Sequence, residues 1–275
     1  MNGESAPVRS WLYVPATRPD MLAKAMAGEA DAVVLDLEDA VPAARKEEAR
    51  RFAARAVRGE WPKPLWVRIN PVRSPVGTAD LEALAGLSPD GLRLPKCEAP
   101  DEVAAVRRYV EAPLHVLIES ALGVEEAFRL ALADPAVRLL SLGEADLRAD
   151  LRVRSSAGLD WARDRIVNAA RAAGLDSPVH SVWTDVADTE GLAADTEAAR
   201  DRGLYGRSVV HPRQIATVNR VFSPRGEEVA QAHRLIRSLH TADGEGTGAW
   251  LDERGRLVDP AVVAQARWVL AQTSG

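Results

Sequence analysis

The sequence predicts an α/β fold: a (β/α)8 TIM barrel followed by a C-terminal helical extension. Short apolar runs rich in Val, Leu and Ile alternate along the chain with Ala-, Arg- and Glu-rich stretches of helical spacing. The apolar runs do not alternate cleanly with polar residues, which is typical of parallel strands covered on both faces. Eight such strand–helix units occupy about 220 residues, near the ~250 residues of a typical TIM barrel.

The elements can be assigned in order along the chain. The strand candidates are residues 11–14, 32–37, 65–70, 91–96, 114–119, 137–143, 178–182 and 208–212. The helix candidates are residues 19–28, 43–58, 78–86, 98–110, 123–133, 159–174, 189–202 and 212–221. Gly174 and Gly203 follow Ala- and Arg-rich runs, as C-terminal caps do. An open doubly wound sheet is the alternative, but no glycine-rich phosphate-binding motif follows the first strand candidate.

The chain is expected to divide into a barrel, residues 1–222, and an extension, residues 223–275. The extension is expected to contain, in order, a helix over 225–239, a mobile glycine-rich loop at 243–248, a turn at 252–255 and a final helix from Asp259 or Pro260. A segment of this length rarely forms a domain alone. We therefore expect an appendage that acts as a lid on the barrel.

Composition excludes several classes of protein. The 275 residues carry 35 Lys and Arg against 40 Asp and Glu, a net charge of −5, whereas nucleic-acid binders usually present a basic face. Cys97 is the only cysteine, which excludes an intrachain disulfide and a four-cysteine zinc site. No apolar run reaches membrane-spanning length, and the N-terminus lacks the apolar core of a signal peptide. We expect a cytoplasmic protein without nucleic-acid or membrane partners.

Polar residues end nearly every strand candidate. They are Asp36, Glu38, Asp39, Arg68, Asn70, Lys96, Glu119, Asp146, His180 and His211. The junctions at the other ends of the strands show no such density. Because barrel enzymes carry their active sites where strands end and the following loops begin, this asymmetry indicates an enzyme.

Glu119 and Asp146 follow two consecutive strand candidates, so their carboxylates are expected to converge. Neighbouring strands lie about 4.8 Å apart, which brings both groups within reach of one cation. Carboxylate oxygens with open water positions suit Mg²⁺, whereas zinc prefers His or Cys. The alternative is an ion pair of either carboxylate with Arg68 or Lys96.

Arg68 lies in an apolar run and is expected to project into the barrel mouth. A guanidinium there can hold a substrate carboxylate through two hydrogen bonds, form a salt bridge to Asp36 or Glu38, or do both. Glu38 and Asp39 can hold waters or Arg68, or cap the next helix. Lys96 raises the alternative of a Schiff-base nucleophile, although nearby carboxylates would keep it protonated.

These residues resemble the HpcH/HpaI aldolase and citrate lyase β-subunit-like family over almost the whole chain. The resemblance rests on RSWLYVPATRPDMLAKAMAGEADAVVLDLEDAVPAARKEEAR (9–50), VRIN (67–70), LPK (94–96), LIES (117–120), GEADL (143–147), WARDRIVNAARAAGL (161–175), DVADTEGL (185–192), GRSVVHPRQI (206–215) and VDPAVVAQARWVL (258–270). The combination is specific, although no single motif is.

The resemblance implies a Mg²⁺-dependent carbon–carbon lyase on a TIM barrel, assembled as a homotrimer. It implies as substrates 3-hydroxyacyl-CoA thioesters such as malyl-CoA, β-methylmalyl-CoA or citramalyl-CoA. The products would be acetyl-CoA or propionyl-CoA and a 2-oxo acid, glyoxylate or pyruvate.

The resemblance also implies roles for the metal and catalytic residues. Glu119 and Asp146 would bind Mg²⁺, and Arg68 would hold the carboxylate of the 2-oxo acid. Asp259 matches a carboxylate that relatives donate to a neighbouring subunit's active site, and it is the candidate acid/base. It can equally be an ordinary N-cap before a helix that starts with proline. Glu38 completes the expected catalytic set.

Apart from Arg68, the expected substrate-binding residues lie in the first and last barrel motifs. Tyr13, Arg18 and Lys24 lie where CoA-using relatives contact the nucleotide. His211, at the end of the last strand candidate, completes the set together with Arg68.

Two departures from the family pattern leave the substrate open. Glu144 stands one place before the usual acid of the metal loop, and His180-Ser181 replaces the Asp-Gly of many relatives. The alternatives are therefore a malyl-CoA thioesterase on the same scaffold and a non-catalytic homologue that binds a 2-oxo acid and Mg²⁺. Arg18, Lys24 and the extension argue against a further option, a CoA-independent pyruvate aldolase.

Overall fold

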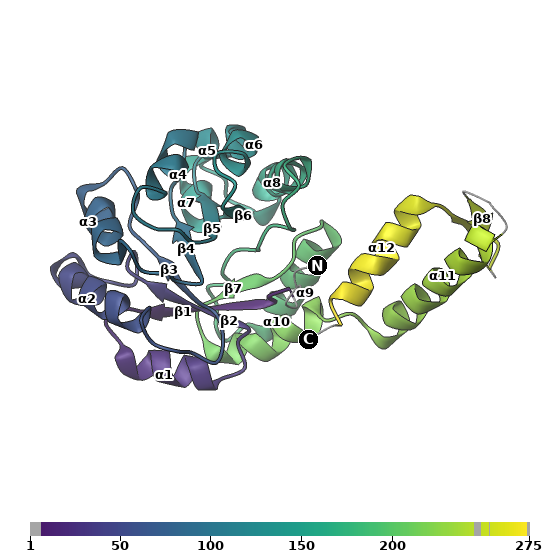
Figure 1. The fold of residues 1–275 in the computed structure, drawn as a ribbon, viewed down its shortest axis with the longest axis horizontal. Helices are drawn as coiled ribbons and strands as arrows, with labels where there is room; N and C mark the ends of the chain where they lie inside the picture. The colour runs from purple at the N-terminus through teal and green to yellow at the C-terminus, as the bar shows by residue number, and fades with distance from the viewer. Residues whose placement is uncertain (1–6, 245–248, 253, 274–275) are drawn as a thin grey trace. The chain divides into compact units, whose positions relative to one another are not determined.

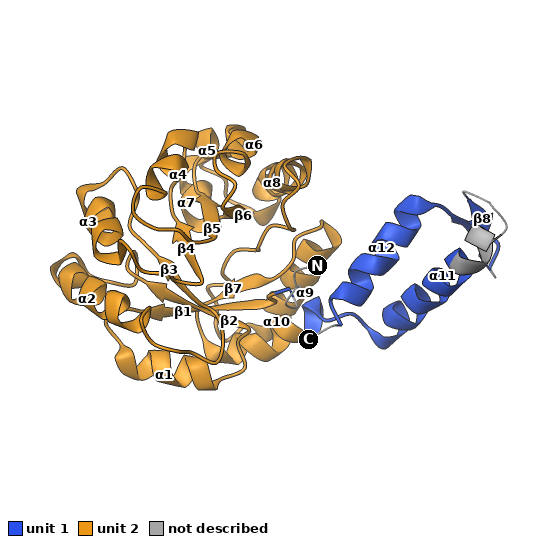
Figure 2. Ribbon diagram, in the orientation of Figure 1, with its two compact units in different colours: residues 1–7, 220–275 blue, residues 8–219 orange. Residues whose placement is uncertain are grey.

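A computed structural model describes residues 7–244, 249–252 and 254–273, which belong to two compact units (Figure 2). One unit is Val8–Asn219, and the other comprises residues 1–7 and 220–275. No helix among the described residues combines the length and the apolar character needed to cross a membrane.

The first unit, called the barrel here, is built on a curled sheet of seven parallel strands (Figure 1). The strands are β1 (Ser10–Pro15), β2 (Ala32–Asp36), β3 (Leu65–Arg68), β4 (Gly91–Leu94), β5 (Leu114–Ile118), β6 (Val137–Leu142) and β7 (Arg207–Val209). Their spatial order is β6-β5-β4-β3-β2-β1-β7. Each of the first six strands therefore neighbours the next along the chain, and β7 returns to β1, as the predicted TIM barrel requires.

The strand expected at residues 178–182 is much shorter than predicted. Val179 forms an isolated parallel bridge to Ser141 of β6, and His180 forms another to Arg207 of β7. Pro178 has no backbone N–H to donate to a ladder, which limits pairing at this position. Two residues thus bridge the outer strands of the sheet where a full strand was expected.

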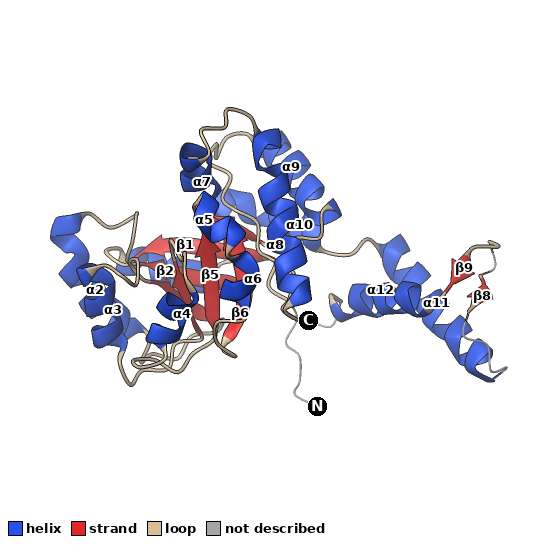
Figure 3. Ribbon diagram, turned by 90° about the horizontal axis from the view of Figure 1, so that it is seen from above, coloured by secondary structure: helices blue, strands red, loops and turns tan. Residues whose placement is uncertain are grey.

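Helices follow the strands and lie outside them (Figure 3). They are α1 (Pro19–Ala27), α2 (Lys46–Ala56), α3 (Pro75–Leu84), α4 (Pro100–Val106), α5 (Ala121–Glu125), α6 (Ala127–Ala131), α7 (Glu144–Asp150), α8 (Asp160–Ala172), α9 (Thr189–Asp201) and α10 (Ile215–Phe222). Gly174 and Gly203 follow α8 and α9 with φ of +75° and +96°, which confirms the predicted caps. The single helix expected at 123–133 is two helices, α5 and α6. Helix α7 was not predicted, because its one buried residue, Leu147, gives no apolar periodicity.

Most residues of the strands are buried, as the composition of the strands predicts. Every residue of β2, β4 and β5 is buried. Inside the barrel, the rings of Trp11 and Trp66 meet edge to face with centroids 5.2 Å apart, and His115 packs against both. Such aromatic pairs contribute about 0.5–1.5 kcal/mol beyond their buried area. The interior below the barrel mouth is therefore packed rather than hollow.

The second unit, called the extension here, consists of two helices and a hairpin. Helix α11 (Gly226–Gly244) packs along α12 (Pro260–Ala271), and β8 (Trp250–Leu251) pairs antiparallel with β9 (Leu257–Val258). The indole N–H of Trp250 donates to Ser238 Oγ of α11 at 3.2 Å, tying the hairpin to that helix.

The extension follows the predicted order of elements. The helix expected at 225–239 extends to Gly244, and most of the glycine-rich segment at 243–248 lies outside the described residues, as does position 253 of the expected turn. The last helix begins as predicted, because the carboxylate of Asp259 accepts a hydrogen bond from the Val262 N–H at 3.0 Å and Pro260 follows the cap.

Candidate active site

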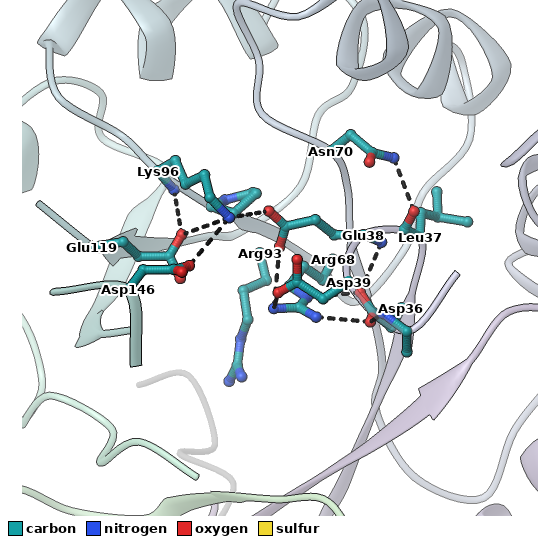
Figure 4. A network of polar contacts seen from close by, with 12 residues as sticks. Asp36, Leu37, Glu38, Asp39, Arg68, Asn70, Arg93, Lys96, Glu119 and Asp146 are labelled. Atoms are coloured by element: carbon teal, nitrogen blue, oxygen red, sulfur yellow. Dashed lines mark hydrogen bonds and ion pairs between the residues drawn. The ribbon is translucent and has the colours of Figure 1, made fainter. Parts of the chain in front are cut away.

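The cluster of polar side chains expected from the sequence lies at the carboxyl ends of five neighbouring strands (Figure 4). Parallel strands end at one edge of a sheet, so residues that follow them meet there. The members that lie together are Glu38 and Asp39 after β2, Arg68 at the end of β3, Lys96 after β4, Glu119 after β5 and Asp146 on α7. The structure thus places four expected residues, Glu38, Arg68, Glu119 and Asp146, around Lys96.

Arg68 is held by carboxylates along its edges. Its Nε and Nη2 donate to the two oxygens of Asp36 at 2.7 Å each, and this pairing follows from the register, which places Asp36 beside Arg68. Its Nη1 lies 3.1 Å from Glu38 and 3.3 Å from Asp39. Burial opposes the charge of Arg68, but the hydrogen bonds to Asp36 raise its pKa above the usual value. The expected salt bridge is confirmed, and it leaves the guanidinium fixed.

Lys96 lies at the centre of the carboxylates. Its Nζ is 2.7 Å from Glu38 Oε1, 3.3 Å from Asp146 Oδ2 and 3.7 Å from Glu119 Oε2. Burial disfavours the ammonium ion, but the hydrogen bond to Glu38 and the neighbouring carboxylates raise the pKa of Lys96 above its usual value. A lysine that stays protonated cannot attack a carbonyl, which argues against the Schiff-base alternative.

The backbone of Lys96 serves the same site. Its φ is +54°, a left-handed conformation that is uncommon for residues other than glycine. In this conformation its N–H donates to Glu119 Oε2 at 2.9 Å. Backbone strain of this kind costs of order 1–3 kcal/mol and concentrates at functional sites. Here the left-handed conformation of Lys96 directs its backbone N–H toward Glu119, a candidate metal ligand.

Glu119 and Asp146 differ in exposure. Glu119 is buried, whereas the Asp146 side chain is 51% exposed. Burial raises the pKa of Glu119 to about 7, and the nearby Lys96 offsets only part of that effect. A Cβ on Gly143 would collide with the Glu119 carboxylate, so the glycine before α7 leaves room for it. One ligand candidate is therefore fixed inside the barrel, and the other opens to water.

This carboxylate pair fits a magnesium ion. Both groups approach one cation in the structure, the Lys96 ammonium, which shows that they converge on a common point. In the described part of the chain no cluster of three or more His, Cys, Asp or Glu side chains has the arrangement of a metal site. Two carboxylates suffice for Mg²⁺, which usually keeps several waters and takes substrate oxygens as further ligands.

Among the described residues, no hydrogen bond or ion pair joins four further expected residues to this group. Arg18 is exposed and paired with Asp20 at 2.8 Å, and Lys24 is exposed on α1. His211 caps the turn before α10, where its Nδ1 accepts from the Arg213 N–H at 3.1 Å. Asp259 belongs to the extension. Local contacts alone therefore assign no shared site to these four side chains.

Tyr13 is partly buried and lies beneath Arg68. The Arg68 guanidinium sits 4.7 Å above the Tyr13 ring, and the Tyr13 hydroxyl accepts a hydrogen bond of 2.8 Å from Arg93. Tyr13 also borders a cavity that Lys24 lines, so the nucleotide contact that the resemblance implies stays a prediction.

Arg93 was not among the residues singled out from the sequence. It lies beside Arg68 in the sheet register, is fully buried, and points away from the carboxylates into the barrel (Figure 4). Its Nη1 donates to Tyr13 and to Ser208 Oγ, and the guanidinium stacks on Trp11 and Tyr13 at 5.2 Å. The only available signal was one arginine within the apolar run GLRL.

A second buried polar cluster lies behind α7. Glu144 binds Arg163 through two hydrogen bonds of 2.7 and 2.6 Å. Asp195 lies 2.8 Å from both His180 Nε2 and Arg207 Nη2. Because Glu144 starts α7, its pairing with Arg163 fixes the turn that carries the metal-ligand candidate two residues later. The unusual acid at position 144 is thus a structural anchor.

The fold and this group of side chains together define a class: a parallel α/β barrel with a carboxylate pair and a fixed arginine at the carboxyl ends of its strands. Residues 9–212 match the HpcH/HpaI aldolase/citrate lyase family, and the chain belongs to this family.

Relatives within the family differ in their reactions. The chain is 32% identical to an L-malyl-CoA/beta-methylmalyl-CoA lyase of Cereibacter sphaeroides, over 97% of this chain and 94% of that protein. It is 34% identical to a (3S)-malyl-CoA thioesterase of the same species, over 99% and 96%. Among solved structures, CitE of Mycobacterium tuberculosis in complex with magnesium, acetoacetate and coenzyme A matches with a TM-score of 0.82 and 33% identity, covering 98% and 99% of the two chains.

Proposed function

We propose that the chain is a Mg²⁺-dependent carbon–carbon lyase that cleaves or forms a 3-hydroxyacyl-CoA such as malyl-CoA or citramalyl-CoA. The observation that carries the proposal is the convergence of Glu119, Asp146 and Arg68 at one edge of the barrel. The similarity to a malyl-CoA lyase and to a structure with bound magnesium and coenzyme A supports the same reaction class.

Arg68 would bind the carboxylate of the 2-oxo acid. Asp36 occupies Nε and one N–H of Nη2, and a guanidinium has five N–H donors, so the second N–H of Nη2 can meet the substrate. Tyr13 supports the guanidinium from below, and Glu38 links it to Lys96. The arginine would therefore reach the substrate without reorganising, which is how preoriented groups lower a barrier.

Glu119 and Asp146 would hold the Mg²⁺ ion. When bound, that ion supplies Lewis-acid polarisation of the 2-oxo acid carbonyl and stabilises negative charge on its oxygen. The burial of Glu119 and the exposure of Asp146 suit an ion that is held on the protein side and open on the substrate side.

The reaction also requires proton transfers at two positions. In cleavage, the 3-hydroxyl loses its proton, the carbon–carbon bond beside it breaks, and the resulting thioester enolate takes a proton on carbon. In synthesis, the carbon proton is removed first and the enolate attacks the carbonyl of the 2-oxo acid. We assign the transfer at carbon to Asp259, an acid/base that a neighbouring subunit of a homotrimer would supply.

Residues on α1 and after β7 would bind the CoA portion. Lys24 borders a mostly apolar cavity of about 320 Å³, which Met21, Val210 and Ile215 also line. Apolar walls suit an adenine ring or pantetheine, and a lysine suits a phosphate. Tyr13, which borders the same cavity, Arg18 and His211 complete the proposed contacts.

A thioesterase is the second candidate, because the similarity to a malyl-CoA thioesterase covers nearly all of both chains. The two activities are distinguished by incubating the purified protein and Mg²⁺ with malyl-CoA, β-methylmalyl-CoA and citramalyl-CoA, and identifying the products by mass spectrometry. A shorter acyl-CoA with glyoxylate or pyruvate establishes the lyase. Free CoA with the intact hydroxy acid establishes the thioesterase. Absence of turnover of all three esters contradicts both.

The role of Asp259 has its own test. Asp259→Asn retains an N-cap side chain but cannot take up a proton, so we expect at least a hundredfold lower turnover with unchanged Mg²⁺ binding. Unchanged turnover would show that Asp259 is only the helix cap seen in the structure. Light scattering on the wild-type protein tests the proposed trimer.

A further inference from the structure

Helix α7 carries the metal-ligand candidate Asp146 but has little apolar packing. It is seven residues long, and Leu147 is its one buried residue. Gly143, which precedes it, supplies no side-chain cap. A helix this short is not stable in isolation. The position of α7 therefore depends on its contacts with the rest of the barrel.

The first residue of α7 is held by a buried arginine of α8. Arg163 Nε and Nη2 donate to the two oxygens of Glu144 at 2.7 and 2.6 Å. The side chains of Glu144 and Arg163 are only 11% and 8% exposed. A charge-assisted contact with two parallel hydrogen bonds is directional as well as strong, so this pair sets the orientation of the first turn of α7.

Arg163 is also fixed by groups other than Glu144. Its Nη1 donates to Ser156 Oγ at 3.0 Å and to Asp160 Oδ1 at 3.1 Å. Asp160 is held in turn by Arg202 at 2.7 Å. The arginine is therefore a firm support for α7, and it keeps a carboxylate partner when Glu144 is replaced.

His180 lies beside Glu144 but does not take over the role of Arg163. Its Nδ1 is 3.6 Å from Glu144 Oε1, which is too long for a hydrogen bond, and its Nε2 is 2.8 Å from Asp195 Oδ2. Burial lowers the pKa of His180 below its usual value, so its ring is neutral at pH 7. Arg163 is therefore the cation that binds Glu144 within this cluster.

Glu144 and Asp146 face different sides of α7. Successive residues of an α-helix are about 100° apart around its axis, so these two are about 200° apart. Glu144 meets Arg163, whereas Asp146 Oδ2 lies 3.3 Å from Lys96 Nζ at the barrel mouth. A shift of the first turn at Glu144 would therefore move the Asp146 carboxylate relative to Glu119.

We propose that Glu144 and Arg163 are positioning residues for the metal site. Their contact holds Asp146 at the place where its carboxylate and that of Glu119 bind one Mg²⁺ ion. This inference rests on the proposed function, because it concerns the Mg²⁺ site of that reaction. Both oxygens of Glu144 are engaged by Arg163, so Glu144 has no place among the ligands themselves.

The test compares two replacements of Glu144 that remove the same charge. Calorimetric titration of the full-length protein with Mg²⁺, without substrate, measures the affinity. Glu144→Ala removes the contact with Arg163, and Mg²⁺ should bind at least about tenfold more weakly, as when partners of metal ligands are replaced. Glu144→Gln keeps an amide oxygen that accepts from Arg163, and its affinity should stay within about threefold of the wild type.

Asp160→Ala is the matched control. It removes a carboxylate that contacts the same arginine, but it leaves the contact between Glu144 and Arg163 intact. Its Mg²⁺ affinity should stay within about twofold of the wild type. Urea unfolding without Mg²⁺ checks that each variant is folded. If Glu144→Ala is not, Arg163→Lys replaces it, because lysine keeps the charge but loses the two parallel hydrogen bonds; it should bind Mg²⁺ severalfold more weakly than Asp160→Ala.

Two results would overturn the proposal. One is an unchanged Mg²⁺ affinity in Glu144→Ala. The other is an equal loss in Glu144→Ala and Glu144→Gln, which would show that only the charge of Glu144 matters. Failure of the proposed function gives a different result: a wild type that does not bind Mg²⁺ removes the metal site itself, and this proposal with it. A wild type that binds Mg²⁺ without turning over any ester leaves the positioning role intact.

Discussion

Two arginines stand side by side on neighbouring strands of the barrel in opposite surroundings. Arg68, at the mouth, has carboxylates of three acidic residues within 3.3 Å. Arg93, in the layer below, contacts hydroxyls and aromatic rings, and its Nε and Nη2 have no hydrogen-bond partner among the described residues. At the mouth, the charge of Arg68 is therefore paired with carboxylates, and such groups can also bind ions. In the interior, the guanidinium of Arg93 instead holds the Tyr13 hydroxyl in place through a hydrogen bond.

The largest expected effect comes from the mouth. Glu119→Gln keeps the size of the side chain but removes the buried negative charge, so the proposed Mg²⁺ site loses one of its two protein ligands. We expect a loss of about 10³-fold in kcat/KM, equivalent to about 4 kcal/mol of transition-state stabilisation. Steady-state kinetics with saturating Mg²⁺ measure this. Asp101→Asn, an exposed acid on α4, is the control and should match the wild type; retained activity in Glu119→Gln would remove Glu119 from the metal site.

The comparison of the arginines predicts unequal stability losses. Arg68→Met leaves Asp36 buried without its cation, and breaking a buried pair in this way costs about 3–5 kcal/mol. Arg93→Met leaves only neutral hydroxyls unpaired and removes a desolvated charge, so we expect a cost below about 1.5 kcal/mol. Urea unfolding of the two variants measures both values. Equal losses would mean that Arg93 has a counter-ion in solution.

The third expected effect concerns pH and metal affinity. Burial raises the pKa of Glu119 to about 7, so below pH 7 the metal must displace a proton. The ionised fraction falls about tenfold between pH 8 and pH 6, and Mg²⁺ affinity should fall by about the same factor. Calorimetric titration at both pH values checks this. The Glu119→Gln variant serves as control, since its residual affinity should not vary through that ionisation.

The smallest expected effect lies at the surface. Arg18 is exposed and paired with Asp20, and exposed pairs contribute about 0–1 kcal/mol to stability. Arg18→Gln should leave the melting temperature unchanged and raise the KM for the CoA ester about threefold to fivefold, in proportion to one lost phosphate contact. Arg51→Gln, an equally exposed arginine on α2, is the control. An unchanged KM would remove Arg18 from the CoA site.

The sequence could predict the gathering of residues at the barrel mouth because of a geometric rule. Parallel strands end at one edge, so Glu38, Arg68, Lys96, Glu119 and Asp146 had to approach one another once the alternating pattern was recognised. The same rule does not say which side chains pair, and the central place of Lys96 follows from its left-handed backbone. The sequence LPK does not predict that conformation.

The interior could not be predicted in the same way. A single arginine in a short apolar strand gives no sign of whether it faces the helices or the barrel axis, so Arg93 was missed. The short bridge at 179–180 depends on long-range pairing with β6 and β7, which local composition at 178–182 does not show.

The ammonium group of Lys96 has a consequence for the stability of the protein when the proposed metal ion is absent. Acidic groups gathered for a divalent ion repel one another when that ion is missing, and many such sites need loading before they become stable. Here a side chain of the chain itself supplies positive charge at the same place. We therefore expect the chain to fold without the proposed Mg²⁺ ion, so a chelator should abolish turnover while leaving the protein folded.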